Sequence, residues 1–124
     1  MRKYKIKTSN KIQFLKPMGF NDYNNLQMNS FAVLSDSGTI SEESSILNFK
    51  ALNIRQAHER PEAMEEASVM MVGLNPERIL QGINHLKNQK VGKNRNFFIP
   101  SDYKNTNVSE KVTRIIISYI DYVN

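Results

Sequence analysis

The sequence predicts an α/β fold organised around a parallel β-sheet, and two observations support this. Short apolar runs of four or five residues alternate with longer segments in which apolar side chains recur every three or four positions. The runs have the length of strands, and the periodic segments have the pattern of amphipathic helices. Because a helical segment separates one strand from the next, the strands are expected to run parallel and to be covered on both faces.

The first predicted strand spans residues 11–15, where polar and apolar side chains alternate weakly before Pro17. The other predicted strands are apolar runs, the first of which is expected to be buried. They span residues 31–34, 51–54 and 68–72.

Helices are predicted between and after these strands, over residues 21–29, 39–47, 61–67, 75–88 and 108–123. Asn75 is expected to cap its helix and Pro76 to be the first helical residue, whereas Gly82 should weaken that helix slightly. The side chains expected to face inward are Tyr23, Leu26, Met28, Ile40, Ile46, Leu47, Ile79, Leu80, Ile83 and Leu86.

The chain is divided into four parts by this pattern. Residues 1–11 form a basic N-terminal tail, residues 12–90 the domain that holds the sheet, and residues 91–107 a connection. Residues 108–124 form a C-terminal helix, which is expected to pack back on the body. Its apolar positions are Val112, Ile115, Ile116, Tyr119 and Ile120.

Composition excludes several classes of protein. Hydrophobic residues make up 40% of the 124-residue chain and charged residues 23%, which is typical of one globular domain. No apolar run approaches the roughly 20 residues that span a bilayer, and the N-terminus lacks the apolar core of a secretory signal. The chain has no cysteine, so disulfides and thiolate metal sites are excluded, and a cytoplasmic location fits.

The net charge of +5 arises from the N-terminal tail. Five basic residues lie in the first eleven positions without an acid among them, and the remaining basic residues equal the 12 acidic ones in number. Such a tail can bind phosphate backbones without specificity, but a solvated, frayed terminus is the preferred interpretation. No specific nucleic-acid binding is expected.

The best candidate for a binding site is the loop after the strand at residues 31–34. Ser37, Gly38 and Thr39 lie between this strand and a helix, where free N–H groups and the helix dipole favour an anion. Gly38 would let a phosphate approach the backbone closely. The alternative is an ordinary turn capped by Ser37.

Three further positions carry candidate chemistry, each with a plainer alternative. Glu43, in the first turn of the helix, could hold a diol, or it could complement the helix dipole as Glu42 does. Arg60 could pair with a phosphate, or it could lie in an exposed loop beside Glu59. Tyr23 could stack on a base, or it could pack a short helix.

No catalytic group or metal site is predicted. His58 is expected to be structural or exposed and His85 to face solvent, and their spacing does not suit a metal. The chain contains no nucleophile elbow and no evident catalytic triad. No cofactor is expected.

Taken together, these motifs resemble the C-terminal part of the non-hydrolysing UDP-N-acetylglucosamine 2-epimerases. They are Asp-Ser-Gly at 36–38, Glu-Glu at 42–43, Glu-Arg-Pro-Glu-Ala-Met-Glu at 59–65 and Val-Gly at 72–73. The amino-acid sequences of residues 35–49 and 70–80 are similar to those of one branch of this family, which makes N-acetylfucosamine-type sugars for bacterial capsules and O-antigens. The resemblance extends from Ile12 over nearly the whole chain.

The resemblance implies the partial C-terminal domain of a two-domain, GT-B-like fold, with a Rossmann-like parallel sheet that binds the UDP half of a UDP-sugar. It places the turn 37–39 on the diphosphate, although most relatives have glycine where Thr39 stands. It also places Glu43 on the ribose hydroxyls, Arg60 on the phosphate–sugar portion and Tyr23 on the uracil. Met18 falls where a main-chain contact to the base is made.

The family's catalytic residues all precede the region that resembles this chain. The resemblance therefore implies that the chain is about the last third of an epimerase, inactive alone, whose partner would be a separately encoded N-terminal domain. Epimerisation at C2 needs an acid, a base and a closed site. The alternative is a non-catalytic nucleotide-binding remnant or module. Relatives are commonly dimers, which leaves a homo-oligomer open.

Overall fold

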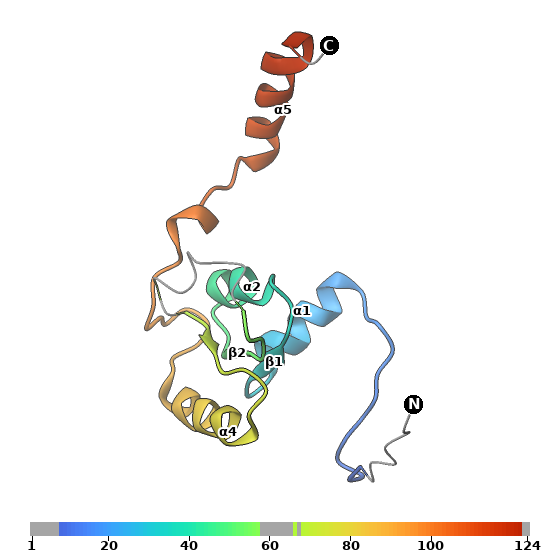
Figure 1. Ribbon diagram of the computed structural model, residues 1–124, viewed down its shortest axis with the longest axis vertical. Helices are drawn as coiled ribbons and strands as arrows, with labels where there is room; N and C mark the ends of the chain where they lie inside the picture. Colours follow the sequence, from blue (N-terminus) through green and yellow to red (C-terminus); the bar gives the residue numbers. More distant parts are fainter. Residues whose placement is uncertain (1–7, 58–65, 67, 123–124) are drawn as a thin grey trace.

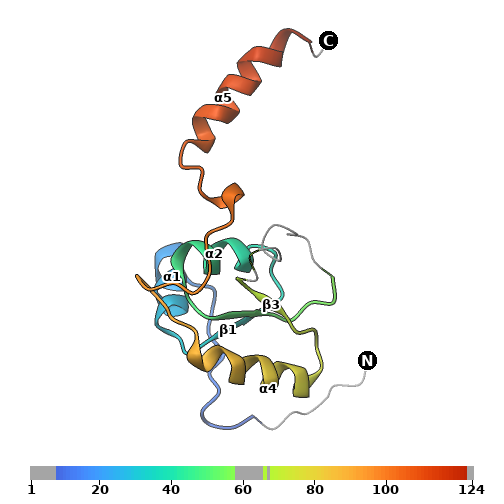
Figure 2. The ribbon, with the colours of Figure 1, turned by 90° about the vertical axis from the view of Figure 1, so that its left-hand side faces the viewer.

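The chain folds around a small parallel β-sheet covered by a helix on each face (Figures 1 and 2). The computed structural model describes residues 8–57, 66 and 68–122. In chain order the helices and strands are α1 Phe20–Asn29, β1 Val33–Ser35, α2 Ile40–Leu47, β2 Ala51–Asn53, β3 Met70–Met71, α4 Pro76–His85 and α5 Val108–Tyr119. Short 3-10 turns occur at Leu86–Asn88, Ser101–Tyr103 and Ile120–Tyr122.

The strands are hydrogen-bonded in the order β1-β2-β3, and both pairs are parallel, as predicted. Val33 pairs with Ala51, and Leu52 pairs with Met70. β2 is the central strand and all its residues are buried. Because the strands are parallel, the residues that follow all three of them lie at one edge of the sheet.

Two apolar clusters pack on opposite faces of the sheet. On the α2 side, Ile40 and Phe49 pack with Ala51 and Val69. On the α4 side, the buried residues are Leu52, Val72 and Leu86, with Ile54, Met70, Ile79 and Ile83 packed against them. Neighbouring residues of β2, Ala51 and Leu52, therefore serve opposite faces, as the period of a strand requires.

The start of α4 has the N-cap and the first residue that the sequence predicts. Asn75 is the N-cap residue, and its Oδ1 accepts hydrogen bonds from the N–H groups of Glu77 (2.9 Å) and Arg78 (3.3 Å). Pro76 is the first helical residue, where its missing N–H removes no helical hydrogen bond. Both predictions are confirmed, and His85 is exposed at the other end of the helix, as expected.

The predicted strand at residues 11–15 is wrong. Residues 12–19 adopt neither helix nor strand, and Phe14 is 83% exposed. Within the described part of the chain, β1 pairs only with β2, so no strand lies beside this segment to stabilise an extended ladder. The predicted strand at 31–34 begins two residues later, at Val33, and Phe31 is exposed. Of the predicted helix at 61–67, the structure describes only Glu66.

The predicted inner face of α1 is also wrong. Tyr23, Leu26 and Met28 are at least 40% exposed, whereas Gln27 is buried. α1 meets the body through a polar contact with α2, so its apolar side chains remain outside. Ile46 and Leu80 are likewise exposed rather than inward. The buried face of α2 consists largely of serines, and the apolar stripe by which α4 packs on the sheet is narrower than predicted.

The C-terminal helix does not pack back on the body. α5 projects away from the sheet and its covering helices in both views (Figures 1 and 2). None of its residues is buried, so the amphipathic pattern predicted the helix correctly but not its packing. Among the described residues, no helix is long and apolar enough to cross a membrane.

Candidate functional site

The candidate site begins in the turn that connects β1 to α2. The Ser37 N–H donates to Ser35 Oγ (3.1 Å), and Ser37 Oγ accepts from the Thr39 N–H (3.3 Å). The hydroxyls of Ser37 and Thr39 lie 2.9 Å apart. Both side chains are exposed, so a ligand can reach two adjacent hydroxyl groups at the carboxyl edge of the sheet.

Ser37 does not cap α2, so the turn differs from the ordinary capped turn that was the alternative interpretation of this loop. Thr39 is the N-cap residue, and its side chain makes no capping hydrogen bond. Ser37 bonds Thr39 itself rather than the N–H groups of the first helical turn. Within the described part of the chain, the Gly38 N–H takes part in no hydrogen bond. This N–H and the positive end of the α2 dipole can therefore serve an anion.

Glu43 lies one turn into α2, half-buried, where its N–H donates to Thr39 O (2.9 Å). Its Oε2 accepts a hydrogen bond of 2.8 Å from Nε2 of Gln27 on α1. The neighbouring Glu42 is also half-buried and has its own interaction partner. The site thus combines neutral donors in the turn with a carboxylate acceptor one helical turn away.

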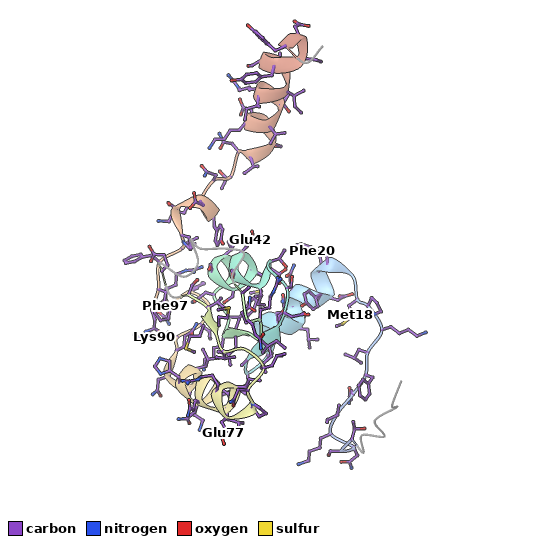
Figure 3. The ribbon with its side chains drawn as sticks, in the orientation of Figure 1. Met18, Phe20, Glu42, Glu77, Lys90 and Phe97 are labelled. Atoms are coloured by element: carbon purple, nitrogen blue, oxygen red, sulfur yellow. The ribbon has the colours of Figure 1, made fainter. Side chains whose placement is uncertain are left out.

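The two candidates for contacting a base lie at α1. Tyr23 is 40% exposed and precedes Gln27 by four residues, so the two side chains lie on one face of the helix. Met18 is 40% exposed in the segment before α1, and Figure 3 shows it near Phe20 at the start of that helix. The hydrogen bond between α1 and α2 brings this helix beside the helix that carries Glu43.

Arg60 and His58 lie outside the described residues, so the structure places neither of them. Gln27 was missed by the sequence reasoning, which assigned the inner face of α1 to its apolar residues. No signal within its own segment could have found it, because its partner Glu43 lies 16 residues further along the chain.

A cavity among the described residues lies away from this site. It measures about 610 Å³ and is lined by residues from the amino edge of β3 and the end of α4, including Ser68, Met70, His85 and Leu86. It is the opposite edge of the sheet from the turn at 36–39, so we do not assign the candidate site to it. No cluster of metal-ligating side chains occurs among the described residues.

Comparison with known proteins identifies relatives of the chain. The family model for UDP-N-acetylglucosamine 2-epimerase matches residues 2–117. UDP-N-acetylglucosamine 2-epimerase of Methanocaldococcus jannaschii is 31% identical over 112 residues, which are 90% of this chain and 29% of that protein. The chain therefore spans less than a third of the length of this curated relative.

Solved structures agree with this result. The structure of UDP-N-acetylglucosamine 2-epimerase from Rickettsia bellii matches 92% of this chain and 31% of its own, with 48% identity and a TM-score of 0.85. The Methanocaldococcus jannaschii enzyme in complex with UDP-GlcNAc and UDP matches 90% of this chain and 29% of its own, with 30% identity and a TM-score of 0.78.

These matches confirm the predicted fold class, a partial Rossmann-like domain of a GT-B-like architecture. The family model covers most of the chain, and it matches the sequence that builds the sheet, the turn at 36–39 and the helix that carries Glu43. The chain belongs to the UDP-N-acetylglucosamine 2-epimerase family.

Proposed function

We propose that this chain is the UDP-binding part of an enzyme that epimerises a UDP-N-acetylhexosamine at C2. The observation that carries the proposal is the arrangement at the start of α2, where two exposed hydroxyls and the Gly38 N–H precede a carboxylate. The relative whose complex holds UDP-GlcNAc and UDP matches 90% of this chain, which supports a UDP-sugar as the ligand.

In this proposal the turn binds the diphosphate. The hydroxyls of Ser37 and Thr39 donate to phosphate oxygens, and the Gly38 N–H and the α2 dipole add to the attraction. To bind in this way, the two hydroxyls exchange their mutual hydrogen bond for bonds to the ligand. Arg60 would pair with the phosphate–sugar portion, where a guanidinium can bind two oxygens at once.

The nucleoside binds between α1 and α2. Glu43 accepts hydrogen bonds from the ribose hydroxyls, because a carboxylate has lone pairs for both donors of a cis-diol. Tyr23 stacks on the uracil, and the main chain at Met18 contacts its edge. The exposure of Tyr23 and its place on the helix that contacts Glu43 support this assignment.

Turnover needs more than this chain supplies. The reaction at C2 requires a general base, a general acid and a site closed to water. The chain spans 31% of the length of the Rickettsia bellii relative. We therefore propose that this segment is inactive alone and acts together with the rest of the epimerase fold, the part of the relative that it does not match. The product would serve bacterial surface polysaccharide synthesis in the cytoplasm, in the N-acetylfucosamine branch.

Titration with UDP, followed by calorimetry, tests the proposal. We expect saturable binding that weakens in Glu43→Ala by about 10- to 100-fold, because hydrogen bonds to charged groups contribute about 1.5–3 kcal/mol. The matched control is Glu77→Ala. Glu77 is also an acidic residue in the first turn of a helix, but it lies on α4, on the opposite side of the body from Glu42 of α2 (Figure 3).

Two results would contradict the proposal. If the folded chain showed no saturable UDP binding, the non-catalytic remnant would become the better explanation and the family would describe ancestry alone. If Glu43→Ala and Glu77→Ala had equal effects, UDP would bind, but not through the carboxylate on α2.

A further inference from the structure

We infer that Gln27 is a positioning residue, which orients the Glu43 carboxylate for the ribose diol and so gives the site its preference for ribose over deoxyribose. The inference rests on the proposed function, and it adds the residue that holds the ribose acceptor in place.

The first support is the geometry of the contact. Nε2 of Gln27 donates to Oε2 of Glu43 at 2.8 Å, across the interface between α1 and α2. A carboxylate can only accept hydrogen bonds, so the amide must turn its nitrogen, and not its oxygen, toward Glu43. The bond fixes one carboxylate oxygen and leaves the lone pairs of the other for a ligand.

The second support is burial. Gln27 is 3% exposed, whereas the apolar residues around it on α1, Leu26 and Met28, are about half exposed. A helix that packed only for stability would turn those apolar side chains inward and leave the amide in water. The contact with Glu43 instead determines which face of α1 meets the body.

The third support is an unsatisfied polar atom. Oε1 of Gln27 is buried and has no hydrogen-bond partner among the described residues. A buried carbonyl without a partner destabilises a fold, and a methionine of similar size would avoid this penalty. The amide is therefore poorly explained by stability alone, and its hydrogen bond to Glu43 points to a role at the site.

The fourth support is the spacing along α1. Tyr23 and Gln27 are one helical turn apart on the same face, with Cβ atoms expected about 5–6 Å from each other. One face of α1 therefore places the residue proposed to stack on the base next to the residue that holds the ribose acceptor. A carboxylate that is already fixed loses less side-chain freedom when the nucleotide binds.

The test compares UDP with 2′-deoxy-UDP by calorimetry, using the full chain. Wild type is expected to prefer UDP. Gln27→Met keeps the size of the side chain but removes the donor, so UDP affinity should fall about tenfold while 2′-deoxy-UDP affinity changes little. Gln81→Met makes the same change at an exposed position of α4 and should leave both affinities as in wild type.

Further variants separate this role from a purely structural one. Gln27→Asn keeps a buried amide that is one methylene too short, and it should lose the preference in the same way. In a Glu43→Ala background, Gln27→Met should have no further effect on either affinity, because a residue that acts through Glu43 cannot act without it. Backbone amide NMR spectra of each variant, compared with those of wild type, establish that it folds.

The outcomes are distinct. If Glu43→Ala abolished the preference for UDP but Gln27→Met and Gln27→Asn kept it, the proposed function would stand and the positioning role would be wrong. A Gln27 effect that persisted without Glu43 would also overturn it. Failure of the wild-type chain to bind UDP would overturn the proposed function, and this inference with it.

Discussion

Gly82 is buried in α4, against the residues that pack between this helix and the sheet. A Cβ at this position would lie 3.0 Å from Cδ1 of Leu52 and 3.0 Å from Cγ1 of Val72. Both neighbours are buried branched side chains in the α4-side cluster, so they have little room to move. Gly82 was expected only to weaken the helix, but the structure shows that it permits the close packing of α4 on β2.

Gly82→Ala is therefore expected to destabilise the chain by about 1–3 kcal/mol, the range found for overpacked cores, although alanine is the better helix former. Urea denaturation would measure the change. Gln81→Ala, next to it on the exposed face of α4, serves as the control and should change stability by less than about 0.5 kcal/mol. Equal stability of Gly82→Ala and wild type would show that the two branched side chains can move aside.

The roles of single residues could be predicted where they depend on neighbours in the sequence, but not where they depend on a contact with a distant segment. Asn75 caps α4 and Pro76 begins it, as expected, because the start of a helix involves only residues within its first turn. Gln27 could not be assigned from its own segment, because its partner Glu43 lies 16 residues away. Ser45 shows the same limit, since its buried hydroxyl forms a hydrogen bond with that of Ser68, 23 residues away (2.8 Å).

At the scale of elements, the segment after α4 holds the end of α2. Arg95 donates to the carbonyl oxygens of Ser45 and Ile46, each at 2.6 Å. Asn48, left-handed at φ 55°, ends the helix, and its Nδ2 donates to Gly92 O (2.8 Å). A guanidinium on the last carbonyls of a helix also complements the negative end of its dipole.

Arg95→Ala should loosen both the end of α2 and the segment that carries residue 95. The guanidinium is exposed, so we expect a loss of only about 1 kcal/mol of stability. Hydrogen exchange would show faster exchange at the end of α2. Lys93→Ala removes a nearby exposed cation, and its exchange should match wild type. Unchanged exchange in Arg95→Ala would mean that Asn48 alone holds this contact.

The same scale shows how far periodicity can predict a fold. The spacing of apolar residues predicted the bounds of α2 and α4 to within a few residues. Each of these helices packs on strands that are its neighbours in the sequence. The strand predicted at 11–15 failed because an alternating pattern does not state whether a neighbouring strand exists. For α1 the period was right, but the buried face was set by a polar contact.

At the scale of the whole molecule, large apolar surfaces are left in water. The apolar side chains of α5, including Val112, Ile115, Ile116 and Tyr119, are all at least 48% exposed. A single helix of 12 residues is marginally stable in water unless its apolar face is buried. The sequence could predict that this face needs a partner but not where the partner lies, because amphipathicity records only which side is apolar.

The relatives suggest what covers α5. The Rickettsia bellii structure matches 92% of this chain but contains about three times as many residues, since the match is 31% of its length. We therefore expect the part of the relative that this chain does not match to supply the acid and the base of the reaction and a surface for α5. The 48% identity makes that relative a suitable source of a complementing polypeptide.

Mixing this chain with that remaining part of the Rickettsia bellii enzyme should restore epimerisation of UDP-N-acetylglucosamine, whereas this chain alone should show none. The readout is the exchange of the C2 hydrogen in deuterated water, because removal of that proton needs both halves of the site.

Ile116→Lys places a charge in the apolar stripe of α5 and should reduce the restored activity at least tenfold, since burying an unpaired charge is strongly unfavourable. Ser118→Lys adds the same charge on the polar face and should act as wild type. Activity of this chain alone would show that it holds its own acid and base, and equal activity of the two lysine variants would show that α5 is not part of the interface.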